Sequence, residues 1–183
     1  TIYVKFGKIT QDAEEKIEHH VSAIEVIVDM IRDLDRGKEF AERVNVNPVW
    51  SKLGEAQLNA QLISECVASF IKAKDPNMYV AVINAAHDHD NYEDLVSYLK
   101  MARQDIKEAM LDTELIYCLA RTNKLTELEE FVHAPNVAKI DQTGERCFDE
   151  GMYEGAKILF QNINNNAKLA LCYIHMDMYR EAV

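Results

Sequence analysis

The sequence predicts an all-α protein, a right-handed superhelix in which helical hairpins stack into a solenoid. The main observation is a short phrase of apolar residues, spaced i, i+3 and i+6 or i+7, that returns about every thirty residues along the chain. Such spacing places three side chains on one face of a helix. In addition, no segment alternates apolar and polar residues over the length that a strand needs. Phrases that return at a fixed distance are typical of helical-repeat arrays, in which each unit contacts only its neighbours.

Each phrase predicts the buried stripe of one helix, and a partner helix between successive phrases would complete each hairpin. The phrases comprise Leu34, Gly37 and Phe40; Ile63, Cys66 and Phe70; Tyr92, Leu95 and Leu99; Leu125, Leu128 and Phe131; Tyr153, Ala156 and Phe160; and Tyr179 and Ala182. With their partners included, we expect helices over residues 12–31, 35–44, 48–59, 63–74, 77–86, 92–104, 109–121, 125–133, 137–150, 153–162 and 167–175.

Short polar side chains mark the expected helix starts, because such side chains can accept hydrogen bonds from backbone N–H groups that lack a partner. The marks are Asn47 before Pro48, Asp75 before Pro76, Asn91 before Tyr92 and Asn123 before Leu125. A proline fits the first helical position, where no N–H donor is needed. Four asparagines within residues 162–166 break the apolar period and predict a turn between two helices, with no further role.

The spacing of the tetratricopeptide pattern is matched twice, and in that pattern a small residue on the first helix lets the second helix approach closely. The matching residues are Trp50, Leu53, Gly54, Phe70 and Ala73 in one unit and Gly144, Ala156 and Phe160 in another. However, Pro76 falls short of the tetratricopeptide proline position, and the unit length drifts between about 26 and 33 residues. We therefore expect related geometry with less regular units.

Composition predicts one continuous body. The 183 residues contain only six Gly and three Pro, with no Ser-rich or Pro-rich run that would form a flexible linker. We expect a single α-solenoid segment over residues 1–183. The chain starts without Met and stops shortly after the sixth phrase opens, so we expect a fragment of a longer solenoid.

The charge balance excludes several classes of partner. A formal net charge of −11 opposes binding to nucleic acid, which requires clustered Lys and Arg. No apolar run reaches the roughly twenty residues of a membrane span, so we expect no direct membrane insertion.

Four cysteines lie far apart without a Cys-x-x-Cys pair, which predicts buried thiols in a reducing, cytoplasmic compartment. They are Cys66, Cys118, Cys147 and Cys172.

Few residues suggest chemistry. The run His87, Asp88, His89 and Asp90 has the side-chain types of a metal site, but neighbours at i and i+2 diverge on a helix, and we predict a solvated turn. His19 and His20 are interpreted as a surface pair on the polar side of the first helix. The sequence contains none of the usual motifs for phosphate binding, for zinc-dependent hydrolysis or for a nucleophilic serine. We therefore expect no catalytic, cofactor-binding or metal-ligating residues, no cofactor and no enzymatic activity.

Aromatic and acidic residues have structural interpretations as well. Trp50 could anchor a binding pocket, but its position on the helix stripe favours the core. Tyr92, Tyr153 and Tyr179 occupy one equivalent place in three units, and repetition at equivalent places predicts packing. Acidic residues at 127, 129 and 130 are interpreted as a solvated helix face.

Longer stretches of the sequence resemble the leg of the clathrin heavy chain. Similar stretches lie at residues 34–43, 48–51, 68–76, 94–103, 113–116, 119–123, 127–131, 135–136, 144–150 and 152–157. They keep their order between about residue 23 and residue 183. Two segments depart from the pattern of that family, 11–20 and the asparagine run at 162–166.

The resemblance implies a clathrin heavy-chain repeat, a leg segment of the three-legged coat unit. A structural coat component of this kind contributes to lattice assembly on coated pits and coated vesicles, in endocytosis and vesicle-mediated intracellular protein transport. The implied partners are other clathrin heavy chains, in the trimer and the lattice, and clathrin light chain through neighbouring leg sequence. The implied location is the cytoplasmic face of these membranes.

Two alternatives stay open at this stage. A related repeat block of a vacuolar sorting tether or a clathrin-linker protein would bind a peptide or protein in a groove with clustered polar anchors. An enzyme would require metal binding at His87 and His89.

Overall fold

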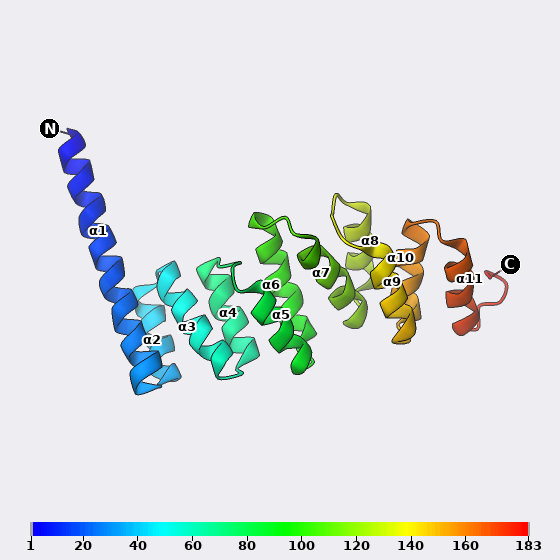
Figure 1. Cartoon of the computed structure of the whole chain (residues 1–183), viewed down its shortest axis with the longest axis horizontal. Coiled ribbons are helices and arrows are strands. Elements are labelled where there is room, and N and C mark those ends of the chain that lie inside the picture. Colours follow the sequence, from blue (N-terminus) through cyan, green and yellow to red (C-terminus); the bar gives the residue numbers. More distant parts are fainter. Residues whose placement is uncertain (1, 183) are drawn as a thin grey trace. The chain divides into compact units, whose positions relative to one another are not determined.

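The computed structural model describes residues 2–182, with side chains from residue 11 onward. Within this range all regular structure is helical, and no strand is found. The helices form hairpins that pack side by side, which confirms the predicted all-α fold class of a helical-hairpin solenoid. They fall into two compact units, Thr1–Met78 and Tyr79–Val183, called here the N-terminal and C-terminal units. Figure 1 shows the elements of each unit in sequence order.

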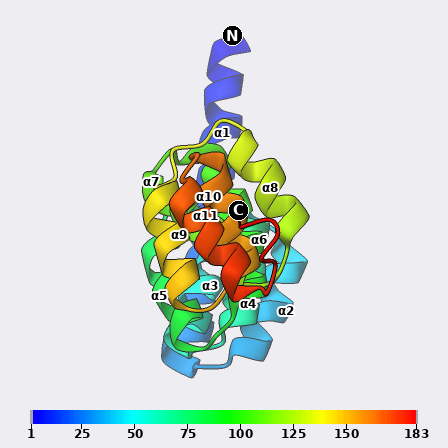
Figure 2. The ribbon, with the colours of Figure 1, turned by 90° about the vertical axis from the view of Figure 1, so that its right-hand side faces the viewer.

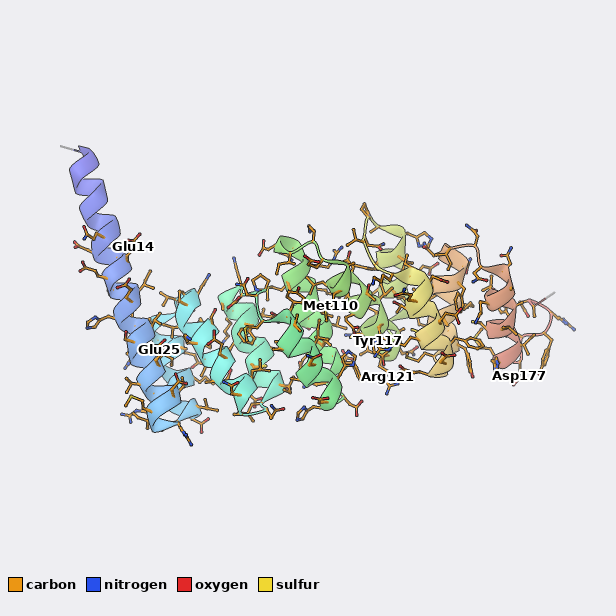
Figure 3. The ribbon with its side chains drawn as sticks, in the orientation of Figure 1. Glu14, Glu25, Met110, Tyr117, Arg121 and Asp177 are labelled. Atoms are coloured by element: carbon orange, nitrogen blue, oxygen red, sulfur yellow. The ribbon has the colours of Figure 1, made fainter. Side chains whose placement is uncertain are left out.

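The N-terminal unit is built from four α-helices and one π-helix. They are α1 (Ile2–Glu25), η1 (Val26–Ile31), α2 (Leu34–Val44), α3 (Asn47–Asn59) and α4 (Ile63–Ala73). The first part of α1 extends beyond α2 and α3, and Glu14 is exposed there (Figures 1 and 3). Although α1 is the longest helix, no helix in the described range is long and apolar enough to cross a membrane.

The predicted first helix, 12–31, differs from the observed one at both ends. The helix α1 begins at Ile2, because the single residue Gly7 does not interrupt it. At the other end the last six residues form η1, after which Arg32 adopts a left-handed conformation with φ of 60°. A π-helix shifts the register of the hydrogen bonds by one residue, and apolar spacing gives no sign of it.

Apolar residues from α1, η1, α2, α3 and α4 form the core of the N-terminal unit. One cluster of buried members comprises Ile24, Val28, Ala41, Val49, Trp50, Leu53 and Ala73, and Leu58, Ile63, Cys66, Val67 and Phe70 are buried as well. Trp50 is only 3% exposed, which confirms its prediction as a core residue. Its indole N–H donates to Asn45 Oδ1 over 3.1 Å, so the ring is buried without leaving an unpaired donor.

The described residues of the C-terminal unit form seven α-helices. They are α5 (Tyr79–Asp88), α6 (Tyr92–Asp105), α7 (Ala109–Arg121), α8 (Leu125–His133), α9 (Ile140–Asp149), α10 (Tyr153–Asn162) and α11 (Asn166–His175). Helices α5, α7 and α9 lie on one side, and α6 and α8 lie on the other (Figure 2). Helix α7 packs against α9, and α8 packs against α10, so each hairpin contacts the next.

Left-handed turns follow most of the helices and connect them to the next helix. In each turn the N–H of a residue with positive φ bonds to the carbonyl three residues earlier, and the next N–H bonds to the carbonyl five residues earlier. This is the Schellman arrangement that closes a helix C-terminus. The residues with positive φ are Gln61, Lys74, Asp90, Asn123, Gly151, Asn164 and Asp177.

These turns correct the predicted helix caps. Asn47 is the first residue of α3 and does not cap it, and Asn91 makes no capping bond. Asn123 is the left-handed residue, one position before the N-cap Lys124. Asp75 accepts the backbone N–H of Asn77, in the turn before α5. Asn91 is the N-cap residue of α6, as predicted, but none of the four expected side-chain caps forms, because a short polar side chain also favours left-handed turns and local bonds.

Side-chain caps occur instead at Asp33, which accepts from Arg36 N, and at Asn165, which accepts from Lys168 N. The predicted turn at 162–166 is confirmed, but its expected lack of a further role is wrong. Asn165 caps α11, and the Asn162 amide donates to the carbonyl of Val132 over 3.3 Å.

The predicted start of the helix at 137 is also too early. Helix α9 begins at Ile140, because α7 side chains accept the preceding backbone donors. The N–H of Val137 donates to Asp112 Oδ2 over 2.9 Å, and the N–H of Lys139 donates to Thr113 Oγ1 over 3.0 Å. These two bonds hold the connecting segment extended along α7.

Five of the six phrases form the helix stripes expected of them, and the sixth does not. Residues 178–181 form a turn with one bond, from Glu181 N to Met178 O, and Tyr179 is 61% exposed. A single turn gains too few backbone bonds to offset the cost of helix nucleation. The packing predicted for Tyr179 is therefore wrong, whereas Tyr92 and Tyr153 are half-buried.

Two glycines allow close contacts between the two helices of a hairpin, as the tetratricopeptide-like spacing predicts. A Cβ added to Gly54 in α3 would lie 2.8 Å from the ring of Phe70 in α4. A Cβ added to Gly144 in α9 would lie 2.9 Å from the ring of Phe160 in α10. Both rings are fully buried, so neither can move away without disturbing the core.

We predict that Gly54→Ala lowers the free energy of unfolding. Overpacking costs about 1–3 kcal/mol, whereas the higher helix propensity of Ala returns at most about 1 kcal/mol. Urea unfolding followed by circular dichroism measures the difference. In a Phe70→Leu background the same substitution should cost less, because the clashing ring is gone. Equal costs in the two backgrounds would show that the glycine does not accommodate the ring.

Candidate functional site

Residues 87–90 are only partly the solvated turn that the sequence predicts. Asp88, His89 and Asp90 are exposed, as expected. His87 is not, because α5 continues to Asp88 and turns the His87 side chain toward α7. Its Nε2 lies 2.8 Å from Glu114 Oε2, and its side chain is 23% exposed. Among the described residues no three His, Cys, Asp or Glu side chains gather as a metal site would require.

The predicted surface pair of histidines on α1 is half correct. His19 is exposed, but His20 is partly buried, and its ring meets the ring of Phe40 edge-on at 6.1 Å. The difference arises because α2 packs against α1 from this point onward.

Two equivalent aromatic triads join successive hairpins of the C-terminal unit. In the first, Tyr92 meets His87 at 5.4 Å and Tyr117 at 6.0 Å between ring centroids. In the second, Tyr153 meets Phe148 at 5.3 Å and stacks on His175 at 4.6 Å. Each triad combines the end of one helix, the start of its hairpin partner and a helix of the next hairpin. The packing predicted for Tyr92 and Tyr153 is therefore confirmed.

Charged groups surround the first triad. The Arg146 guanidinium on α9 lies over the ring of Tyr117 on α7, 3.5 Å from its centroid. The same guanidinium pairs with Glu114 at 3.5 Å and with Glu150 at 3.2 Å. A cation over an aromatic ring that also pairs with two carboxylates is held in one orientation. Arg146 therefore fixes α9 against α7.

Tyr117 and Arg121 extend this network along the same side of α7 (Figure 3). The Tyr117 hydroxyl donates to Glu150 Oε2 over 2.8 Å, and Arg121 pairs with the same carboxylate at 3.3 Å. Burial raises the pKa of the Tyr117 hydroxyl, and its hydrogen bond to the Glu150 carboxylate raises that pKa further. The phenol therefore stays neutral and acts as a hydrogen-bond donor.

A buried carboxylate anchors a second contact between hairpins. The Asp112 side chain is 8% exposed, and its Oδ1 accepts the Nε–H of Arg103 over 2.8 Å. Its other oxygen accepts the Val137 N–H described above. The Arg103 guanidinium also lies 4.5 Å from the centroid of the Phe131 ring. Asp112 thus links α6, α7 and the segment before α9.

Two further ion pairs between neighbouring hairpins lie on the surface. Lys100 pairs with Glu127 in α8, and Lys124, the N-cap residue of α8, pairs with Glu93 in α6. Glu127 is therefore not simply solvated, as the sequence predicted, whereas residues 129 and 130 are exposed. Exposed pairs of this kind contribute about 0–1 kcal/mol each and mainly set register.

The four cysteines are buried free thiols, as predicted. Burial raises the pKa of Cys118, raises that of Cys147 to about 12 and raises that of Cys172 to about 11. A thiol with a raised pKa is a poor nucleophile, because the thiolate is the reactive form.

Stacked helical hairpins, joined by aromatic triads and buried ion pairs, define an α-solenoid repeat protein. A family model described as a region in clathrin and VPS matches residues 70–183. The chain therefore belongs to the clathrin repeat family.

Individual relatives agree with this assignment. The chain is 47% identical over 169 residues to a probable clathrin heavy chain 1 of Caenorhabditis elegans and 46% identical over 168 residues to clathrin heavy chain 2 of Homo sapiens. Each match covers 92% of this chain and 10% of the relative. Clathrin heavy chain 1 of Arabidopsis thaliana is 43% identical over 97% of this chain and 11% of its own length. The chain thus spans about a tenth of the length of these relatives.

We predict that Asp112→Ala destabilises the chain by about 2–4 kcal/mol, because it leaves the Arg103 guanidinium and the Val137 N–H without their partner. Urea unfolding measures the change. Glu127→Ala, which removes a carboxylate from an exposed pair, is the control and should cost less than about 1 kcal/mol. Similar losses in both variants would contradict an anchoring role for Asp112.

We predict that Tyr117 makes the folded chain sensitive to alkali. An unfolded tyrosine ionises near pH 10, whereas the folded pKa is raised, so above pH 10 the unfolded state binds fewer protons and stability falls. The slope from this residue reaches about 1.4 kcal/mol per pH unit. Unfolding free energies of Tyr117→Phe between pH 10 and 12 should fall less steeply than those of the wild type.

The comparison has an internal control between pH 7 and 9. There the two proteins should have parallel pH profiles, because Tyr117 is neutral in both the folded and the unfolded state. The buried thiols contribute equally to both profiles at every pH. Parallel profiles above pH 10 as well would contradict the prediction.

Proposed function

We propose that this chain is a leg segment of a clathrin heavy chain and that it contributes to lattice assembly on coated vesicles. The observation that carries the proposal is the extent of similarity to clathrin heavy chains, which covers 92% of the chain at 46–47% identity in two animals. The role is structural: a stack of hairpins that resists bending and presents its surface to other legs. It requires no catalytic residues and no cofactor.

The contacts inside the C-terminal unit support a mechanical role. The aromatic triads, Arg146 and Asp112 connect one hairpin to the next, so bending at this place would break partly buried polar contacts. Breaking such contacts is costly because each leaves a partly buried charge without its partner. A segment of this kind transmits force along its own length.

The surface supports weak polar contacts with neighbouring legs. Glu129 and Glu130 on α8 are exposed and form no ion pair within the described range, unlike Glu127 on the same helix. Polar interfaces of modest strength suit a coat that must later come apart. In this proposal the partners are other heavy chains, light chain binds neighbouring leg sequence, and the location is the cytoplasmic face of coated pits and vesicles.

A second candidate, a repeat block of a vacuolar sorting protein, receives support from one observation. The description of the matching family names VPS proteins beside clathrin. The relatives described above are named clathrin heavy chains, and this favours the coat protein.

Charge reversal tests the lattice role. We expect Glu129→Lys with Glu130→Lys, in an assembly-competent heavy chain that carries this segment, to change the yield of sedimentable cages at least severalfold. The matched control is Lys100→Glu with Glu127→Lys, which exchanges the charges of an existing pair and should leave the yield unchanged. The lattice role is wrong if reversal of exposed charges, at these positions and on the other helices in turn, never alters cage yield.

A further inference from the structure

A groove of about 280 Å³ opens on the N-terminal unit, among α2, α3 and α4. Its lining residues are Lys38, Trp50, Gln57, Ser64, Glu65, Ala68, Ser69 and Lys72. Pockets for drug-sized ligands begin at about 300 Å³, so the groove suits one or two side chains of a larger partner better than a cofactor.

Gln57 presents a hydrogen-bond donor to this groove. The residue is 3% exposed, and its Oε1 accepts the hydroxyl of Ser69 over 2.6 Å. That is the sole hydrogen bond of its side chain within the described residues. No side-chain nitrogen or oxygen in this range is both fully buried and without a partner, so the Gln57 amide nitrogen reaches the groove. A buried donor that faces an open groove is satisfied best by an acceptor from a ligand.

Two lysines add positive charge at the same place. The Lys72 ammonium lies 4.1 Å from the centroid of the Trp50 ring, which holds it beside the groove. Lys38 lines the groove from α2, and neither lysine forms an ion pair with any described residue. In a chain with a net charge of −11, two unpaired cations and an unused amide donor mark a place for acceptor groups.

Glu65 favours a peptide over a phosphate as the ligand of this groove. Its carboxylate lines the groove and would repel a phosphate more strongly than a peptide carboxylate, because a phosphate carries more negative charge. An extended peptide carries backbone N–H groups beside its carbonyls, and Glu65 can accept one of them. We propose that this groove binds a short extended peptide segment with acidic side chains, with its carboxylates at Lys38 and Lys72 and a backbone carbonyl at Gln57. This binding goes beyond the proposed lattice role and does not depend on it.

Trp50 provides a direct readout, because it is the single tryptophan of the chain and lies under Lys72. The probe is a blocked hexapeptide of alternating Glu and Ala, and its control is the same peptide with Gln in place of Glu. We expect a saturable change in Trp50 fluorescence with the Glu peptide at low salt, because a carboxylate draws the ammonium away from the indole. The Gln peptide should bind at least about tenfold more weakly.

Substitutions locate the binding. Lys38→Glu and Gln57→Leu should each weaken binding of the Glu peptide at least about tenfold. Lys74→Glu makes the same charge change on an exposed lysine outside this groove and should leave binding unchanged. Circular dichroism verifies that each variant is folded.

Four outcomes would overturn the proposal: no saturable response, equal response to the two peptides, equal loss in Lys74→Glu, or full competition by inorganic phosphate at the affinity of the peptide. The last would assign the groove to small anions. None of these outcomes bears on cage assembly, so failure here and failure of the lattice role are distinguishable.

Discussion

The close contact between the two helices of a hairpin is the constraint on which the rest of each unit depends. Gly54 against Phe70 and Gly144 against Phe160 let a buried ring lie on the backbone of the facing helix. That approach brings the apolar stripes of both helices into one core and sets the position of the next hairpin. The aromatic triads and the ion pairs of Arg146 and Asp112 then join neighbouring hairpins of the C-terminal unit.

Polar contacts then make the stacking specific. Apolar stripes alone would tolerate slippage of one hairpin along another, since many small offsets bury similar area. The Tyr117 hydroxyl, the Asp112 carboxylate and the extended segment before α9 each require one register. The chain belongs to the clathrin repeat family. In its structure the apolar stripes recur from hairpin to hairpin, whereas each of these polar contacts occurs at one place only within the described residues.

Most of the fold could be predicted from apolar spacing, because a stripe of i, i+3 and i+6 or i+7 residues has one structural solution when it is buried. The sequence could not predict where backbone donors find partners far along the chain, as Val137 does at Asp112, or that His87 faces Glu114. Nor does apolar spacing distinguish an α-helix from the π-helix η1. Nor could the sequence predict the hydrogen-bonding character of the groove beside Trp50. It depends on the Ser69 hydroxyl bonding to the oxygen of the Gln57 amide, which leaves the amide nitrogen available.

The turns between helices are closed by main-chain bonds that form whatever side chain occupies the left-handed position, although the Gln61 amide adds a bond to the Leu58 carbonyl over 3.5 Å. Residues as different as Gln61, Lys74, Asp90 and Gly151 occupy it with similar backbone bonding. The charge and size of the side chain at this position can therefore change by substitution with little cost to the free energy of folding. The turns are thus positions where substitutions can alter the surface of a unit without changing its packed interior.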